Sequence, residues 1–260
     1  MPAPNDTIDL SQGVELILHA NGRLEPSPAL VALLVAARSG YDWPAGTGPN
    51  HSQQTILNLE ATVAGLLNNL NTTTAHRIVT EVSRWAGNNA SSHANIVHAA
   101  EETKVHMLNA ITALDAADGP GVGLDVLSNL PGVSLVIATK IYRFCFPLVG
   151  VAVDRHASYF FNSLDVVAPN QQRAKATHFL REWANGRHTS TRLRIYDRAG
   201  YEGNRKEYTN NYLPLLSRIT EALNGLTAPY NCAATNQRRS WRPADIEMAA
   251  YYWWACHGSR

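Results

Sequence analysis

The residue types that could bind a phosphate gather in a short turn between two predicted helices. The first helix is expected to end near Asn129, because Pro131 cannot extend it and Gly132 permits a tight backbone turn. The second helix is expected to begin at Ser134 or Leu135. Such a turn presents backbone N–H groups at a new helix N-terminus, where free donors and the helix dipole favour an anion. The spacing therefore indicates a phosphate site, although a purely structural turn between helices uses the same residues.

A carboxylate stands at the start of the next predicted helix. Asp154 follows an apolar stretch that ends at Val153. A carboxylate at this place accepts hydrogen bonds from the free N–H groups of the first helical turn and interacts favourably with the helix dipole. Asp154 therefore has a structural interpretation as an N-cap, and the residues alone leave a catalytic interpretation open beside it.

These two features resemble one known family. The turn Leu130–Ser134 resembles the helix-hairpin-helix motif of DNA-binding proteins, whose commonest form has a glycine where Ser134 stands. After the second helix comes Val153-Asp154-Arg155-His156, at nearly the distance at which a similar aspartate follows the hairpin in the helix-hairpin-helix DNA glycosylase superfamily. Residues 127–164 together resemble that superfamily, and within it the 8-oxoguanine-glycosylase-like branch.

The resemblance implies a DNA glycosylase that flips a damaged or modified base out of double-stranded DNA and hydrolyses its N-glycosidic bond. The catalytic carboxylate of the superfamily corresponds to Asp154, which would stabilise the oxocarbenium-like sugar and orient or deprotonate water. Gly132, Val133 and Ser134 would anchor a DNA phosphate together with a bound monovalent cation, and no other cofactor and no metal site is expected. Further DNA contacts are expected from Arg143, Arg155 and His156.

Lys140 is the second candidate catalytic residue. In bifunctional members of the superfamily, a lysine at the start of the second hairpin helix attacks the sugar as a Schiff-base nucleophile, and Val136 occupies that position here. Lys140 lies one turn later, on the same helix stripe as Val136 and Arg143. Lys140 is therefore a candidate nucleophile, with a phosphate contact or an ion pair with Asp154 as alternatives, and strand cleavage after base excision stays open.

The excised base is also left open. The resemblance favours oxidised guanine, as in DNA repair, or a hypermodified phage cytosine such as glucosyl-hydroxymethylcytosine, as in antiviral defence. Asn88 and Asn89 resemble the wedge loop that fills the hole left by the flipped base, or belong to an ordinary polar loop. The C-terminal segment holds rings that could stack on a base and a carboxylate that could read its edge, or that pack in the core: Trp241, Glu247, Tyr251 and Tyr252.

The elements that must position these residues are predicted to be helices. Apolar residues recur at three- and four-residue spacing along most of the chain, which predicts an all-α fold. The resemblance adds a glycosylase-like arrangement of two helical lobes with a cleft between them. Helices are expected over residues 14–20, 28–38, 55–70, 75–86, 94–114, 122–130, 135–145, 155–164, 170–184, 207–224 and 243–256.

The charge of the chain is unevenly distributed. Residues 1–130 hold 5 Lys and Arg against 12 Asp and Glu, whereas residues 131–260 hold 17 against 9, so the second half is basic within a net charge of +1. Clustered positive charge is typical of a polyanion partner, or of a solvated face. We expect one glycosylase-like unit over residues 1–260, with an acidic lobe over 1–118 and a basic lobe over 119–260 that contains the hairpin 127–145.

The composition excludes several other classes. Hydrophobic residues make up 45 % and charged residues 17 % of the 260 residues, which excludes global disorder. No apolar run is long enough to span a bilayer, and three distant cysteines exclude a disulfide framework. We therefore expect a cytoplasmic protein with no membrane and no obligate protein partner. The alternatives to an enzyme are a non-catalytic helix-hairpin-helix DNA-binding protein and a helical protein with no nucleic-acid role.

Overall fold

The computed structural model describes residues 13–41, 52–167, 173–175 and 205–257. Within these ranges the chain is predominantly helical, which confirms the coarse fold class. The helices are α1 (Pro28–Ser39), α2 (Gln53–Leu67), α3 (Thr72–Trp85), α4 (Ala90–Val97), α5 (Glu101–Ala113), α6 (Gly121–Ser128), α7 (Leu135–Cys145), α8 (Arg155–Ser163), the π-helical turn η2 (Tyr208–Tyr212), α11 (Leu213–Gly225) and α12 (Pro243–His257).

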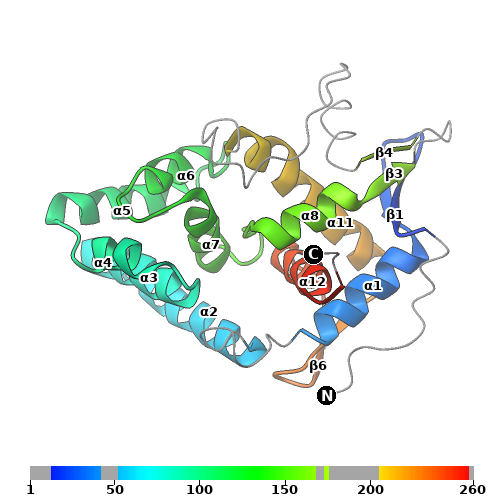
Figure 1. Cartoon of the computed structure of the whole chain (residues 1–260), viewed down its shortest axis with the longest axis horizontal. Helices are drawn as coiled ribbons and strands as arrows, with labels where there is room; N and C mark the ends of the chain where they lie inside the picture. Colours follow the sequence, from blue (N-terminus) through cyan, green and yellow to red (C-terminus); the bar gives the residue numbers. More distant parts are fainter. Residues whose placement is uncertain (1–12, 42–51, 168–172, 176–204, 258–260) are drawn as a thin grey trace.

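The helices pack in two groups that share one continuous core. The helices α2 to α7 follow one another along the chain and pack mainly on each other, whereas α1 packs on α12, which also contacts α8 and α11 (Figure 1). The N-terminal helix therefore belongs with the C-terminal part, and the hairpin helices α6 and α7 belong with α2 to α5. The expected lobes 1–118 and 119–260 cut across both groups, because apolar faces and not the sign of the charge decide packing.

Short strands correct part of the all-α expectation. The segment expected as a helix over 14–20 contains β1 (Glu15–Leu18), in which Leu16 and Leu18 alternate with less buried neighbours in the period of a strand. It pairs antiparallel with β2 (Leu24–Pro26) and parallel with β3 (Asp165–Val167), which pairs with β4 (Arg173–Lys175). A second, two-stranded sheet joins β5 (Tyr230–Cys232) to β6 (Gln237–Arg239).

Two expected helices also differ in extent. The segment 94–114 forms two helices, α4 and α5. The chain turns between His98, the C-cap of α4, and Ala100, the N-cap residue of α5, and His76 Nε2 lies 2.8 Å from the Ile96 carbonyl oxygen near this turn. Of the helix expected over 170–184, the described residues 173–175 form strand β4 instead. In the described part of the chain, no helix combines the length and the apolarity that crossing a bilayer requires.

Candidate active site

The predicted hairpin turn is held against α4. Helix α6 ends at Ser128 and α7 begins at Leu135, with Ser134 as its N-cap, as the sequence predicts. Gly132 has a φ of +84°, and a Cβ at this position would lie 2.2 Å from the Ser92 carbonyl oxygen. Only glycine fits this left-handed, close-packed position. The turn therefore has a fixed place relative to α4, and it presents the N-terminus of α7.

The two asparagines of the expected wedge loop belong to this contact. Asn88 Nδ2 donates hydrogen bonds to the Gly132 carbonyl at 2.9 Å and to Ser83 Oγ at 3.1 Å. Asn89 is exposed, and its Oδ1 accepts from the Ser92 N–H at 2.9 Å as the N-cap of α4. Asn88 is thus used to hold the hairpin, whereas the exposed Asn89 keeps a wedge role as a prediction.

Asp154 lies beside the middle of α7. It is the N-cap of α8, and its Oδ1 accepts from the Ala157 N–H at 2.9 Å. The preceding residue is tied to α7, because the Val153 N–H donates to Thr139 Oγ1 at 3.2 Å. The tyrosines of η2 hold the same segment, since Tyr212 donates its hydroxyl hydrogen to the Ala152 carbonyl at 3.3 Å. These bonds fix the carboxyl next to the turn of α7 that carries the second candidate residue.

Lys140 acts on Asp154 electrostatically. Its Nζ lies 5.5 Å from the centre of the Trp85 ring, and it forms no ion pair among the described residues, so the expected ion pair with Asp154 is absent. Burial raises the pKa of Asp154, while the positive charge of Lys140 and the Ala157 N–H act to lower it. The net effect is a pKa of Asp154 above its ordinary value, because burial outweighs these two opposing effects.

A second carboxyl belongs to the same cluster. Glu247 on α12 is only 6 % exposed. Burial raises its pKa to about 8, the negative charge of Asp154 adds to the rise, and Arg143 and Lys140 oppose it. Asp154, Glu247 and Lys140 thus come together from three elements. We use "acid pair" for Asp154 and Glu247. The sequence placed Glu247 near a base pocket but gave no sign of this pairing, because α12 and the Asp154 segment are far apart along the chain.

Aromatic rings border the acid pair. The His156 ring meets Tyr251 edge-on with centroids 5.2 Å apart, and His156 Nδ1 is buried without a hydrogen bond to any described residue. Tyr252 lies 5.7 Å from Tyr41, measured between ring centroids. Tyr251 and Tyr252 are partly exposed. Tyr251 thus packs against His156, two residues after Asp154, and Tyr252 packs against Tyr41, so their role in stacking on a base stays a prediction.

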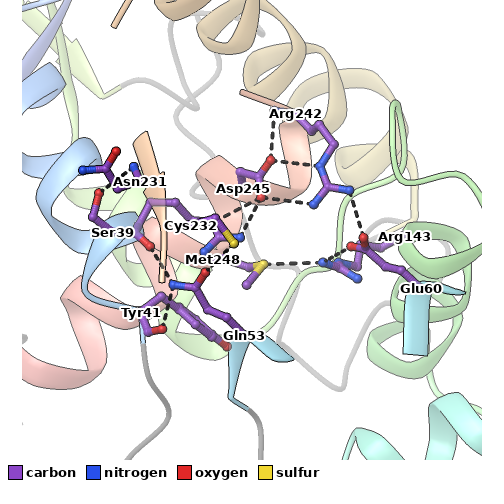
Figure 2. Close-up of polar contacts among 11 residues, drawn as sticks. Ser39, Tyr41, Gln53, Glu60, Arg143, Asn231, Cys232, Arg242, Asp245 and Met248 are labelled. Carbon is purple, nitrogen blue, oxygen red and sulfur yellow. Dashed lines mark hydrogen bonds and ion pairs between the residues drawn. The ribbon is translucent and has the colours of Figure 1, made fainter. Parts of the chain in front are cut away.

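Figure 2 shows a network of ion pairs that includes Glu60, Arg143, Arg242 and Asp245. Arg143 Nη2 lies 2.8 Å from Glu60 Oε1, and Arg242 Nη1 lies 3.0 Å from Glu60 Oε2. Arg242 and Arg38 both donate to the Asp245 carboxylate at 2.9 Å. Burial would raise the pKa of Asp245, but Arg38 and Arg242 outweigh it and hold that pKa well below its usual range. The network joins α1, α2, α7 and α12.

Two sequence predictions need correction. Arg143, expected to contact DNA, is only 2 % exposed and forms an ion pair with Glu60, because its stripe of α7 faces α2 and α12 rather than solvent. Trp241, expected in the pocket, is 3 % exposed and donates its indole N–H to the Ala228 carbonyl at 2.6 Å, so it packs in the core. The side chain of Arg155 lies outside the described part of the structure.

Comparisons of the chain with protein-family models, with curated proteins and with solved structures found no significant match. Within the described residues, no group of three or more His, Cys, Asp or Glu side chains is arranged to hold a metal ion.

Proposed function

We propose that the protein is a DNA glycosylase whose catalytic carboxylate is Asp154. The observation that carries the proposal is the placement of Asp154 at the head of α8, with Lys140 and a second carboxyl in electrostatic reach and a glycine-turn hairpin leading into the same α7 helix. Titratable groups with strongly shifted pKa values in one cluster are typical of acid–base catalysis.

Each part of the cluster has a task in base excision. The N-terminus of α7 would hold a backbone phosphate through its free N–H groups. The ionised form of Asp154 would stabilise the oxocarbenium-like sugar and take a proton from the attacking water. The positive charge of Lys140 favours that ionised form, since it lowers the pKa of Asp154. Extruding the base costs a few kcal/mol, least for a damaged or weakly paired base.

The partly exposed aromatic residues support a stacking pocket for an extruded base. The Tyr251 ring lies beside His156, and the His156 Nδ1, which has no hydrogen-bond partner among the described residues, could donate to or accept from a base edge. The substrate classes that we propose are oxidised guanine and a hypermodified cytosine such as glucosyl-hydroxymethylcytosine. Double-stranded DNA is the proposed partner, with a monovalent cation at the hairpin.

One observation favours a second candidate, a non-catalytic DNA-binding protein. The hydrogen bond from Ala157 to Asp154 is that of an ordinary N-cap, and it accounts for an aspartate at this position without any reaction. A non-catalytic protein would bind DNA through the hairpin, and the acid pair would have no role in a reaction.

The test compares base release by the wild type and by Asp154→Asn. Asparagine caps a helix about as well as aspartate, so the variant keeps α8 while losing the ionisable oxygen. The substrates are duplexes with 8-oxoguanine, uracil, alkylated bases or glucosyl-hydroxymethylcytosine, with freed bases identified by mass spectrometry. Glu81→Gln, at a partly exposed position on α3, serves as the control.

The expected result is release of one base class by the wild type and by Glu81→Gln. Asp154→Asn should lose about 100- to 10,000-fold in rate with DNA affinity retained. Binding of every duplex without release of any base would favour the binding module instead. Absence of salt-dependent DNA binding would remove both candidates.

Lys140 needs its own experiment because its role as a nucleophile stays open. Borohydride reduction traps a Schiff base between a lysine and the sugar, which gives a covalent protein–DNA product. If Lys140 attacks the sugar, the wild type forms this product and Lys140→Met does not. If Lys140 only tunes Asp154, neither forms it, although the wild type still releases the base.

A further inference from the structure

We propose that Glu247 is the acid of this site, sharing one proton with Asp154 and donating it to the base as the N-glycosidic bond breaks. This inference rests on the proposed function and deepens it, because it assigns a further catalytic residue and narrows the class of base.

The geometry around Glu247 supports a proton donor. The residue lies on α12, the helix that packs most closely on α8, which Asp154 caps (Figure 1). Its carboxyl accepts no hydrogen bond from any described residue, and it is not part of an ion pair among them. An ionised carboxylate in such a place is costly, whereas the protonated form is neutral and can donate.

The charged and titratable groups around Glu247 come from every neighbouring element. They are Asp154 before α8, Lys140 and Arg143 on α7, Arg38 on α1, Tyr41 after it, and Tyr208 and Tyr212 on η2. The two arginines are bound elsewhere, Arg38 to Asp245 and Arg143 to Glu60. Lys140 thus remains the one cation of this set with no described ion-pair partner, although Arg143 and Arg38 also act to lower the pKa of Glu247. Because the pKa values of both carboxyls are nevertheless raised, we infer that the acid pair holds one proton.

The proton cycle of the acid pair closes without any other reactant. When the C1′–N bond breaks, its electron pair stays on the base nitrogen and the sugar becomes oxocarbenium-like. Glu247 gives its proton to the base, so the base leaves neutral. Water attacks C1′, and its proton goes to the carboxylate of Asp154. Transfer of that proton from Asp154 to Glu247 restores the starting state, and the sum is hydrolysis of one glycosidic bond.

This role selects the class of base. A neutral base would leave as an anion unless it is protonated, and therefore gains from an acid. A cationic N-alkylated purine leaves neutral without any proton, so an acid adds nothing. We therefore assign neutral bases, such as cytosine derivatives or oxidised purines, as substrates that depend on Glu247.

The experiment measures single-turnover base release against pH for the wild type, Glu247→Gln, Asp154→Asn and the exposed control Glu221→Gln. The wild-type rate on the released neutral base should fall on the alkaline side, as Glu247 loses its proton. Glu247→Gln should be about 100- to 10,000-fold slower and lose this alkaline limb. Glu221→Gln should match the wild type in rate and in pH profile.

Three outcomes separate this inference from the proposed function. If Glu247→Gln keeps the wild-type rate and the alkaline limb while Asp154→Asn is inactive, the acid role is wrong and the glycosylase stands. If Glu247→Gln fails to fold, the wild-type profile still decides, because a rate without an alkaline limb overturns the role. If the wild type frees no base from any duplex, the proposed function itself fails, and the acid role with it.

A second readout uses the leaving group. On a duplex with 7-methylguanine, a cationic base, Glu247→Gln should lose less than 10-fold relative to the wild type, because departure needs no proton. An equal loss on cationic and neutral bases would indicate a structural role for Glu247 and overturn the assignment.

Discussion

Asp245 and Glu247 lie two residues apart on α12, and both are almost fully buried, yet the pKa values of their carboxyls shift in opposite directions. Asp245 accepts hydrogen bonds from Arg38 and Arg242, and these cations hold its pKa well below the usual range despite burial. Glu247 has no such partner, and burial together with the charge of Asp154 raises its pKa to about 8. One helix turn thus carries an acid whose pKa is lowered and an acid whose pKa is raised.

The comparison shows that the supply of cations, and not burial, decides the charge of these groups. The three arginines of the network are taken up by Asp245 and Glu60, which join α1, α2, α7 and α12. Among the cations near the acid pair, Lys140 is the one that forms no ion pair with a described residue. The network of Glu60, Asp245 and three arginines is paired and joins the helices. The cluster of Asp154, Glu247 and Lys140 has fewer cations than carboxyls, and its raised pKa values suit it to proton transfer. The first is suited to stability and the second to chemistry.

The largest effect is expected where the paired acid is broken. Asp245→Asn leaves the buried Arg38 without its anion and removes one of the two anions of Arg242, and we expect a loss of about 3–5 kcal/mol in the free energy of unfolding. Urea denaturation measures it, with the exposed Asp118→Asn as a control. A loss under about 1 kcal/mol would mean that the network is not a structural element and would remove the contrast with Glu247.

Glu247, which has no ion-pair partner among the described residues, should instead make the free energy of unfolding depend on pH. The folded-state pKa of Glu247 is raised from 4.5 to about 8, so its contribution to stability is fully present below pH 4.5 and is lost as the pH rises towards 8. The raised pKa of Asp154 acts in the same direction. The wild type should lose up to about 1.4 kcal/mol per pH unit for one proton in this window. Glu247→Gln should flatten that slope, measured by urea denaturation between pH 5 and pH 8.

Removing the shared cation should sharpen the contrast further. Lys140→Met takes a positive charge away from both carboxyls, so their pKa values should rise and the pH-dependent loss of stability should begin at higher pH. Loss of the contact with Trp85 should cost about 0.5–1 kcal/mol. Chemical denaturation over a pH series measures both effects. Asp245 should keep its low pKa, because its own arginines are untouched, and a change there would contradict the separation of the two regions.

Much of the local structure could be predicted from the sequence. The bounds of α7, the proline at the start of α12 and the glycine turn between α6 and α7 follow from signals within a few residues. The N-cap role of Asp154 has the same origin. These features depend on contacts that are close along the chain, which is why periodicity and turn residues identify them.

The features that could not be predicted from the sequence depend on contacts between residues that are far apart along the chain. The sequence predicts a helix over 14–20, but the segment forms β1 because it pairs with β3, where Asp165 lies opposite Glu15 across a long stretch of chain. Arg143 was expected on the surface, and only the position of Glu60 makes it an interior residue. The acid pair has the same character, since the burial of Glu247 depends on how α12 meets α8. The type of a residue and its position on a helix do not determine which residue of another helix it will contact.

The smallest effect tests whether geometry alone makes a strong pair. Arg84 Nη1 lies 2.8 Å from Glu81 Oε2, slightly closer than the 2.9 Å between Arg38 and Asp245. Arg84 is 60 % exposed, however, so water and salt screen the attraction. Glu81→Gln should change the free energy of unfolding by less than about 0.5 kcal/mol, with a smaller effect at high salt. A loss comparable to that of Asp245→Asn would mean that distance and not burial sets the strength of these pairs, and the contrast within α12 would then need another cause.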